Sequence, residues 1–317
     1  MKRFKNILFL YNGEIGSEAA LVRAQALARS NGARLTLLEV VQHVPSDLVA
    51  LLGGTPLDQP EIEARYMEER RALLERVAVS IRQDGVPAEI KVLRGKAFLE
   101  TIRTVLRDGH DLIVMIADSV KGLRNITFGS TSMHLMRKCP CPVWVMKPKA
   151  GSRFRRILAA VDPPVDGKAN SPLDVKIVQL ATSLSHMEGC ELDVVHAWDL
   201  VGPDLETSRS ENTERMLTDL LERNRSAHEE AVERLLAESG LNGTQPRIRL
   251  LRGEPWSIVP RFARQHAVDL IVMGTVTRTG IAGFLIGDTA EHVLQQVDCS
   301  VLAVKPEGFQ TPITLES

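Results

Sequence analysis

The chain has 317 residues, enough for two domains of ordinary size, and its 44% hydrophobic and 25% charged residues are typical of a globular protein. Its 39 basic and 40 acidic residues give a formal net charge of −1, which excludes a general electrostatic attraction to nucleic acid or anionic membranes. Four cysteines in a chain of this length do not form a disulfide framework, so we expect a reducing, cytoplasmic compartment.

The N-terminus combines basic residues with the apolar run Ile7–Tyr11, which could indicate a secretory signal or a strand. The run is too short for a signal peptide, and no small-residue cleavage site follows it. We therefore expect a first β-strand. No apolar run in the sequence approaches the ~20 residues that a membrane-spanning helix needs.

The first half of the chain alternates apolar runs with amphipathic ones. The run NILFLY predicts a buried strand, and SEAALVRAQALARSNG predicts a helix capped by Ser17 and stopped by Gly32. The elements expected next are a strand RLTLLEVV, a long charged helix Glu61–Gln83, a strand EIKVL, a helix near Phe98–Arg107, a strand DLIVM, a helix from Ser130 to Arg137 and a strand PVWVM.

The second half repeats this pattern. The pairs that are 158 residues apart are LRG at Leu93–Gly95 and Leu251–Gly253, DLIVM at Asp111–Met115 and Asp269–Met273, Gly129 and Gly287, Cys141 and Cys299, and Lys147–Pro148 and Lys305–Pro306. The first strands, at Ile7–Leu8 and Ile157–Leu158, are 150 residues apart, so the second half carries about eight extra residues. Their composition places them in the loop Pro163–Pro172. The second long helix is expected at about Glu211–Glu238.

The repeat predicts domains at residues 1–149 and 153–309, with the seam in the polar segment Lys147–Arg153 and a C-terminal tail at 310–317. Strands separated by helices pair in parallel through right-handed crossovers, with helices on both faces. The predicted class is α/β, with two tandem doubly wound domains that each contain a five-stranded parallel sheet. The apolar, β-branched strands match sheets buried on both sides.

Such sheets bind ligands beyond the carboxyl ends of the strands, where strand order reverses. Each half should therefore have a site between the end of its first strand and the loop after its fourth. The first strands end at Asn12 and Asp162, and either side chain could accept a hydrogen bond from a ligand hydroxyl or amine. Asp162 is followed by two prolines and could equally shape a turn.

The loop after the fourth strand carries a recognisable motif. The segment GTVTRTGIAGFLIGDTAEHVL at Gly274–Leu294 contains Gly274-x2-Thr277-x9-Gly287-Asp288, which resembles the signature of universal stress proteins. The ATP-binding members of that family have Gly-x2-Gly-x9-Gly-(Ser/Thr). The resemblance covers nearly the whole chain, once per half, and with the tail Phe309–Leu315 it is most similar to the tandem-domain type. It implies an adenine nucleotide alpha hydrolase-like fold and ATP as a possible ligand.

Each half departs from the motif differently. In the second half Thr277 replaces the second glycine and Asp288 the closing Ser/Thr, and an ionised Asp288 would cap its own helix and repel a triphosphate. In the first half Ile116 and Ser119 replace the two glycines, while Gly129–Ser130 remains. The glycines would allow close backbone approach and a positive φ. The candidate ligand-binding residues are Asn12, Ser119, Gly129, Ser130 and Thr131 in the first half and Asp162, Gly274, Thr277, Gly287, Asp288 and Thr289 in the second.

The first-half loop has two interpretations. Its hydroxyls and the helix start at Gly129–Ser132 could hold an anion, with Lys121 and Arg124 as counter-charges and Asp118 opposing them. Ser130 could instead be an ordinary helix N-cap.

Other constellations do not form a site. Cys139 and Cys141, with His134 upstream, could suggest a soft-metal site, but no second pair completes it and we predict no metal. A turn into a buried strand explains them better. His134 and His292 are also 158 residues apart, as equivalent positions on a helix. No nucleophile elbow, zinc-protease motif or P-loop is present, so we predict no dedicated catalysis.

These observations predict a non-enzymatic stress-response protein with two tandem universal stress domains, which acts as a binding or signalling module with degenerate nucleotide sites. The alternative is an ATP-binding member with weak ATPase activity or ATP-gated partner binding. The apolar loop Val44–Leu57 leaves a third option, an apolar ligand.

We expect unknown protein partners and no binding to nucleic acid or membranes. If isolated family members pair through their fifth strands, as the resemblance implies, PVWVMKP and SVLAVKP would pair within one chain as an internal pseudo-dimer. Such pairing would leave a monomer or a homodimer.

Overall fold

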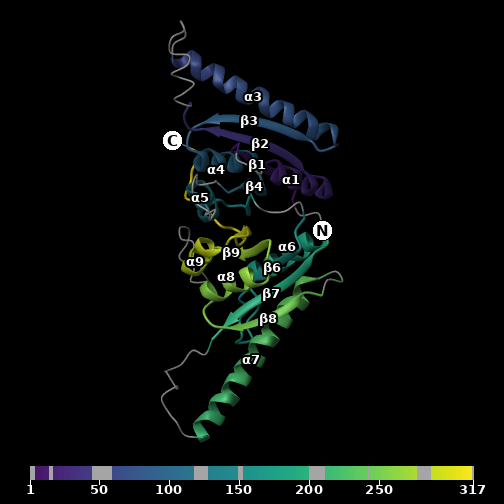
Figure 1. Ribbon diagram of the computed structural model, residues 1–317, viewed down its shortest axis with the longest axis vertical. Coiled ribbons are helices and arrows are strands. Elements are labelled where there is room, and N and C mark those ends of the chain that lie inside the picture. Colours follow the sequence, from purple (N-terminus) through teal and green to yellow (C-terminus); the bar gives the residue numbers. More distant parts are fainter. Residues whose placement is uncertain are drawn as a thin grey trace. The chain divides into compact units, whose positions relative to one another are not determined.

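The computed structural model describes residues 4–13, 17–44, 59–117, 128–148, 153–199, 211–241, 243, 245–276 and 287–315 (Figure 1). The chain divides into two compact units, built mainly from residues 1–149 and 150–308, and the last residues, Phe309–Ser317, belong to the first unit. In that unit the Arg103 guanidinium donates to the carbonyl of Thr314 over 3.4 Å. Within the described part of the chain, no helix is long and apolar enough to span a membrane.

The first unit alternates strands and helices. Its elements are β1 (Asn6–Tyr11), α1 (Ser17–Asn31), β2 (Arg34–Val41), α3 (Gln59–Gln83), β3 (Ala88–Arg94), α4 (Ala97–Asp108), β4 (Leu112–Ile116), α5 (Ser130–Lys138) and β5 (Val143–Met146). The strands are parallel and ordered β3-β2-β1-β4-β5. Strand order therefore reverses between β1 and β4.

The second unit repeats this topology. Its elements are β6 (Arg156–Ala160), α6 (Pro172–Glu188), β7 (Glu191–Trp198), α7 (Glu211–Ser239), β8 (Arg247–Arg252), α8 (Pro255–Gln265), β9 (Leu270–Gly274), α9 (Asp288–Gln296) and β10 (Ser300–Val304). The parallel order β8-β7-β6-β9-β10 places the reversal between β6 and β9. The predicted class and tandem arrangement are confirmed.

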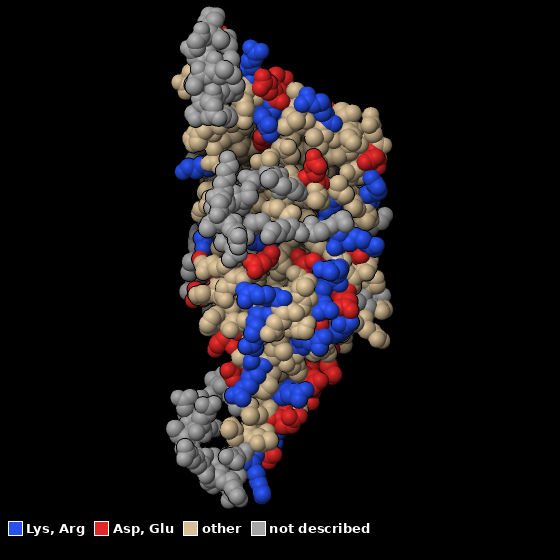
Figure 2. Space-filling model, in the orientation of Figure 1, with Lys and Arg blue, Asp and Glu red and all other residues tan. Residues whose placement is uncertain are grey.

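The inner strands form where apolar, often β-branched residues follow one another, whereas the edge strands β3 and β8 also carry charged residues. All five residues of β4 are buried, and neighbouring residues of a strand face opposite sides of the sheet. Both faces of the sheet are therefore covered, as an all-parallel sheet requires. Charged residues remain outside, and Figure 2 shows Lys and Arg interspersed with Asp and Glu over the visible face. This mixing agrees with the nearly balanced net charge.

The starts of the inner strands show the repeat in atomic detail. The Asp111 carboxylate accepts the backbone N–H groups of Lys5 and Asn6 at 2.6 and 3.1 Å. Asp269 does the same for Arg155 and Arg156 at 2.7 and 3.1 Å. Each aspartate therefore fixes its fourth strand against the first strand of the same unit.

The ends of α4 and α8 differ at one position. Helix α4 ends at Gly109, whose φ of 68° lies in the left-handed region that glycine enters without strain. The equivalent position after α8 is Ala267, with φ 49°. A side chain in this region is strained, so the second unit carries a small local cost that the first avoids.

The starts of α1 and α6 differ in how they are capped. Ser17 is the first residue of α1 and its hydroxyl donates to the Asn12 side-chain oxygen over 3.3 Å, so the hydroxyl bridges to the end of β1. Helix α6 begins at Pro172, and its cap is Ser171, which accepts the Leu173 N–H at 3.2 Å. The predicted loop Pro163–Pro172 is confirmed except for its last residue, which begins α6.

Candidate functional site

The second unit has a cavity of about 440 Å³ at the carboxyl ends of β6 and β9. The starts of α6 and α9 and parts of β7 and α8 complete its wall. This is the reversal of strand order to which the sequence assigned a ligand. The structure brings four of the predicted residues together in the wall, namely Asp162, Gly274, Gly287 and Thr289. Their role in binding remains a prediction.

Two carboxylates stand at this cavity. Asp162 follows β6 and its side chain is 66% exposed, so it can reach a ligand. Its backbone N–H donates to Oδ1 of Asp174 over 3.2 Å. Asp174 is buried in the first turn of α6, where the helix dipole stabilises its negative charge. The sequence contains a signal for Asp174, because Ser171 and Asp174 have capping-box spacing before an apolar run.

Gly274 at the end of β9 serves the cavity through its small size. A Cβ atom built there would lie 2.9 Å from Cδ2 of Leu173, which lines the same cavity. The expected positive φ is wrong for Gly274, and the N-cap glycines Gly129 and Gly287 have φ of −67° and −64°. These glycines therefore matter for close packing and for lacking a side chain.

Helix α9 starts at the predicted position, but its cap is not the predicted residue. Its N-cap is Gly287, which has no side chain, and Asp288 is an exposed first helical residue. The Asp288 carboxylate makes no hydrogen bond or ion pair with any described residue and does not line the cavity. The prediction that Asp288 caps its own helix is wrong, because the cap position falls one residue earlier. Its charge, with that of Glu291, still makes the first turn acidic.

A histidine pair lies behind Asp162. His196 in β7 is buried, and its Nδ1–H donates to the Val161 carbonyl at 3.2 Å. In that tautomer Nε2 accepts from Nδ1 of His228 in α7 at 2.7 Å. Oδ1 of Asp162 is 3.8 Å from Nδ1 of His196. Burial lowers the pKa of His228, and the Asp162 charge opposes that shift in part. Sequence spacing gives no signal for this cluster.

The first unit has different contacts at the equivalent position. Asn12 donates to the carbonyl of Ile116 at 3.4 Å and accepts from Ser17. Ile116, buried at the end of β4, occupies the place of Gly274. Polar contacts and an apolar side chain therefore link the strand ends here.

The start of α5 in the first unit uses a glycine cap. Gly129 is the N-cap, so the interpretation of Ser130 as the N-cap is wrong, and the Ser132 hydroxyl donates to the Gly129 carbonyl over 2.9 Å. Ser130 is exposed and Thr131 half-buried in the first turn. The predicted residues outside the described ranges are Ser119, Thr277, Asp118, Lys121, Arg124 and most of the loop Val44–Leu57.

The paired cysteines lie where the chain turns into β5. Their Sγ atoms are 3.5 Å apart and both side chains are buried. The hydrogen bond with Cys139, together with burial, raises the pKa of Cys141 well above its ordinary value, so the thiol stays protonated. Among the residues that the structure describes, no group of three or more His, Cys, Asp or Glu side chains could hold a metal ion.

The fold defines a tandem protein of the doubly wound α/β class, with a cavity at the reversal of strand order in its second unit. The family model described as "Universal stress protein family" matches residues 3–147 and 153–305. The chain belongs to the universal stress protein family.

Full-length relatives share the tandem organisation. The chain is 27% identical over 321 residues to Universal stress protein E of Escherichia coli K12, covering 100% of this chain and 98% of the relative. It is 25% identical to a Universal stress protein E homolog of Haemophilus influenzae, over 96% of this chain and 98% of the relative.

Solved structures share the fold. A functionally unknown protein from Pseudomonas aeruginosa PAO1 has a TM-score of 0.73 at 23% identity, covering 97% of this chain and 95% of that one. A universal stress protein from Archaeoglobus fulgidus has a TM-score of 0.61 at 18% identity, with 95% and 98% covered. At these identities the likeness supports the architecture alone.

Proposed function

We propose that this tandem universal stress protein is a non-enzymatic binding module whose second unit takes a nucleoside-like ligand and has lost the charge complementarity for a triphosphate. The observation that carries the proposal is the composition of the 440 Å³ cavity. Its wall combines apolar side chains with two carboxylates, and none of the described residues that line it is Lys, Arg or His.

The size and polarity of the cavity fit this ligand class. Small-molecule sites span roughly 300–1,000 Å³ and combine an apolar wall with a few polar groups. Val195 and Ala197 of β7 and Met273 of β9 offer apolar surface for a flat ring. Exposed Asp162 can accept hydrogen bonds from ligand hydroxyls, and such charge-assisted bonds are strong.

The same cavity disfavours phosphates. Asp162 and Asp174 lie in its wall, and Asp288 and Glu291 make the first turn of α9 acidic. A helix N-terminus attracts an anion through its amides and dipole, but these carboxylates offset that attraction. Each unit charge a few ångströms from a phosphate costs on the order of 1–4 kcal/mol between bulk-water and surface dielectric values.

Calorimetric titration of adenosine, AMP and ATP into the purified chain tests the proposal. We expect affinity to fall from adenosine to ATP, and Asp162→Asn to weaken adenosine binding by about tenfold, the equivalent of 1.4 kcal/mol. ATP binding ten times more tightly than adenosine would contradict it. The matched control is Asn12→Ala, which alters the equivalent position of the first unit.

The alternative, an ATP-binding protein with weak ATPase activity or ATP-gated partner binding, is favoured by a different observation. The first unit keeps Gly129–Ser130, and the first turn of α5 contains no acidic residue. Single-turnover assays with labelled ATP distinguish the two functions. ADP formation that Ser130→Asp abolishes, and that Asp162→Asn leaves unchanged, would place an active nucleotide site in the first unit.

The internal pairing of the fifth strands, PVWVMKP with SVLAVKP, and a cytoplasmic location remain part of this proposal. Paired strand edges would leave the chain as a monomer or homodimer that can bind protein partners. Light scattering at micromolar concentration tests the pairing, and a large oligomer would contradict it.

A further inference from the structure

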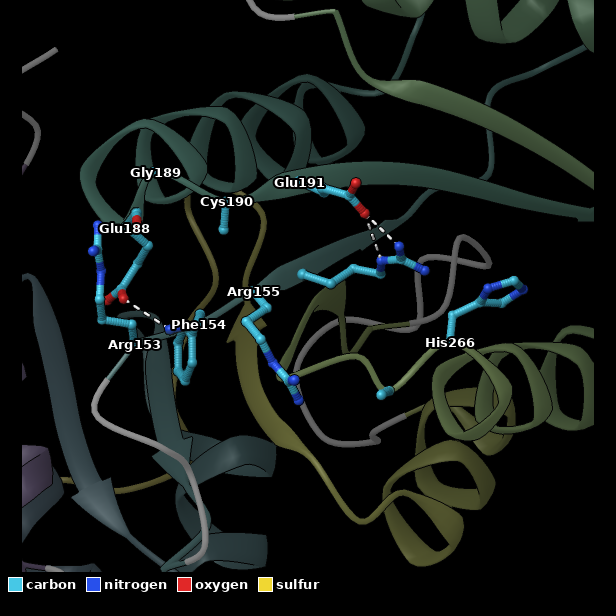
Figure 3. A pocket seen from close by; sticks show the side chains of 10 residues that line it. Arg153, Phe154, Arg155, Glu188, Gly189, Cys190, Glu191 and His266 are labelled. Atoms are coloured by element: carbon cyan, nitrogen blue, oxygen red, sulfur yellow. Dashed lines mark hydrogen bonds and ion pairs between the residues drawn. The ribbon is translucent and has the colours of Figure 1, made fainter.

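A second cavity, of about 600 Å³, lies at the N-terminal ends of the strands of the second unit. The first cavity lies at their carboxyl ends. Figure 3 shows its wall, formed by Arg153–Arg156 at the start of β6, Glu188–Glu191 between α6 and β7, and His266–Ala267 after α8. It shares no lining residue with the 440 Å³ cavity. The two cavities are separate sites within one unit.

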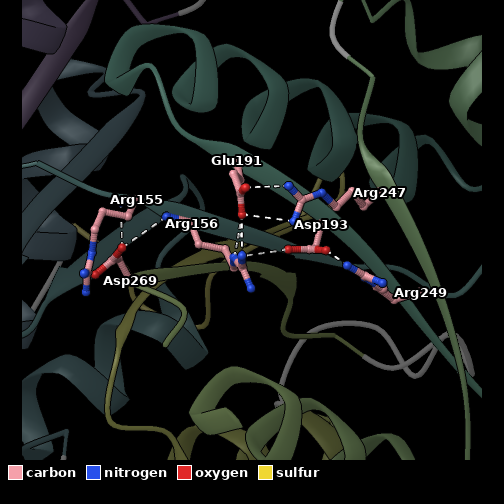
Figure 4. A network of polar contacts seen from close by, with 7 residues as sticks. All are labelled: Arg155, Arg156, Glu191, Asp193, Arg247, Arg249 and Asp269. Carbon is pink, nitrogen blue, oxygen red and sulfur yellow. Dashed lines mark hydrogen bonds and ion pairs between the residues drawn. The ribbon is translucent and has the colours of Figure 1, made fainter. Parts of the chain in front are cut away.

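Several charges at these strand ends neutralise one another. Arg156 and Arg247 both bind the Glu191 carboxylate, and the Arg156 Nε–H donates to it at 3.0 Å (Figure 4). Asp193 is completely buried and accepts from Arg249 at 2.9 Å, with Arg156 at 3.6 Å on its other side. Arg156 and Glu191 therefore bind charged residues of the protein itself, although both line the cavity.

The other basic side chains of the wall make few or no polar contacts with the described residues. Arg155 donates its backbone N–H to Asp269, but its exposed guanidinium makes no hydrogen bond or ion pair with a described residue. The exposed His266 ring packs 4.2 Å from the ring of Phe262 and has no hydrogen-bond partner within the described ranges. Arg153 reaches the Glu188 carbonyl only at 3.5 Å. In Figure 3 Arg155 and His266 extend from different elements, point away from each other and have no partner among the residues drawn.

In the first unit the residues at the equivalent positions bind other residues of the protein. Lys5 takes the place of Arg155, and its ammonium donates to the Asn31 carbonyl at the end of α1 over 2.8 Å. Asp108 takes the place of His266 and binds Lys91 at 2.6 Å. Helix C-termini attract cations, so Lys5 serves the fold of its unit. In the second unit Arg153 contacts the equivalent carbonyl, that of Glu188, and the Arg155 side chain does not.

We propose that this cavity binds the phosphate group of a small phosphorylated molecule at the Arg155 guanidinium, with the His266 and Arg153 side chains of the same wall available to the rest of the ligand. A guanidinium presents paired N–H groups that match a phosphate oxygen pair. Of the two carboxylates in the wall, Glu191 is bound by two arginines and Glu188 accepts the Phe154 N–H at 3.1 Å. The cavity volume suits a metabolite-sized ligand.

The test is calorimetric titration of phenyl phosphate and inorganic phosphate into the full chain at constant ionic strength, with benzoate as the carboxylate of similar shape. We expect saturable 1:1 binding of phenyl phosphate that Arg155→Gln weakens at least tenfold. His266→Asp, which installs the residue of the first unit, should weaken it at least as much. The matched control Lys5→Gln should leave affinity within twofold. Both altered residues of the site are exposed, and thermal midpoints check that each variant stays folded.

The variant Gly274→Ile distinguishes this site from the 440 Å³ cavity. It fills that other cavity and should leave phenyl phosphate affinity unchanged. Three results would overturn the proposal: binding that does not saturate, equal affinity in Arg155→Gln, or loss of binding in Gly274→Ile. Benzoate binding as tightly as phenyl phosphate would overturn the assignment to phosphate.

Discussion

The two units have the same strand order, but their switch-point sites differ in chemistry. In the first unit Asn12 donates to the Ile116 carbonyl and accepts from the Ser17 hydroxyl, and the Ile116 side chain is buried there. In the second unit Asp162 and Asp174 lie beside a cavity that Gly274 helps to keep open. The buried strands set the fold in both units, so the residues at the strand ends were able to diverge.

The difference extends to the contact between the second strand and the long helix. Glu39 in β2 binds Arg70 of α3 at 2.7 Å, an ion pair. The second unit makes the equivalent contact with the His196–His228 hydrogen bond at 2.7 Å. An ion pair and a hydrogen bond between two histidines thus occupy the same place in the fold, and the histidine pair lies beside the exposed Asp162.

The largest effect is expected from Ile116→Gly, which gives the first unit the residue of the second. Ile116 is buried, and losing such a side chain costs roughly 2–5 kcal/mol, to which glycine in a strand adds about 0.5–1 kcal/mol. Urea unfolding should show a loss of about 3–5 kcal/mol. A loss below about 1 kcal/mol would mean that Ile116 is not part of a tightly packed end of β4.

The reverse exchange, Gly274→Ile, should lower the stability less than Ile116→Gly does and should weaken adenosine binding more. Its Cβ would meet Leu173 at 2.9 Å, and overpacking of this kind costs about 1–3 kcal/mol. The side chain would enter the cavity, so adenosine affinity should fall at least tenfold. Unchanged adenosine binding in a destabilised variant would place the ligand elsewhere.

A smaller effect should appear as pH dependence of stability in the second unit. Burial holds the pKa of His228 below its ordinary value of 6.5, so the unfolded chain takes up the proton first as pH falls. The stabilisation is complete above pH 6.5 and is lost as pH falls below it. His228→Gln, whose amide can still donate to His196, should therefore reduce the drop in urea midpoint between pH 7.5 and 5.5. His43→Gln, at an exposed position, is the control and should keep the wild-type drop.

Replacing the aspartate at the start of α9 should raise ATP affinity modestly. Asp288→Ser combined with Thr277→Gly removes an exposed charge from α9, worth roughly 0.3–1 kcal/mol at a helix start. ATP titration should show a gain of up to about tenfold. Ser130→Asp is the counter-test in the first unit. Weaker ATP binding in the double variant would show that charge at α9 does not limit nucleotide affinity.

The smallest effect is expected at the helix ends. Ala267→Gly removes the left-handed alanine after α8 and should stabilise the chain by about 0.5–1 kcal/mol. Gly109→Ala should destabilise it by a similar amount. Thermal unfolding of both variants measures the pair, and destabilisation by Ala267→Gly would contradict the assignment of strain.

The fold was predictable because its signals are local and repeated. Most strands are apolar runs such as DLIVM, and the recurrence of that run and of LRG predicted the same element order in both halves. The switch-point rule then placed Asp162, Gly274 and Gly287 close together, although more than 110 residues separate Asp162 from the other two.

The parts that sequence reasoning missed depend on the orientation of side chains. Asp174 meets Asp162 because the first turn of α6 faces the end of β6, and His228 meets His196 through the placement of α7. The errors at Ser130 and Asp288 have one cause, since glycine is the N-cap in both helices and each of these residues is the exposed first residue of its helix. A one-residue shift at a helix start is beyond the resolution of sequence patterns.

The C-terminal tail has a consequence for the order in which the protein is made. Residues Phe309–Ser317 belong to the first unit, and the contact between Arg103 and Thr314 joins positions 211 residues apart. The ribosome releases the N-terminal strands long before this tail emerges, so the first unit begins to fold first and is completed last. A chain shortened by ten residues would therefore damage the unit that was synthesised earliest.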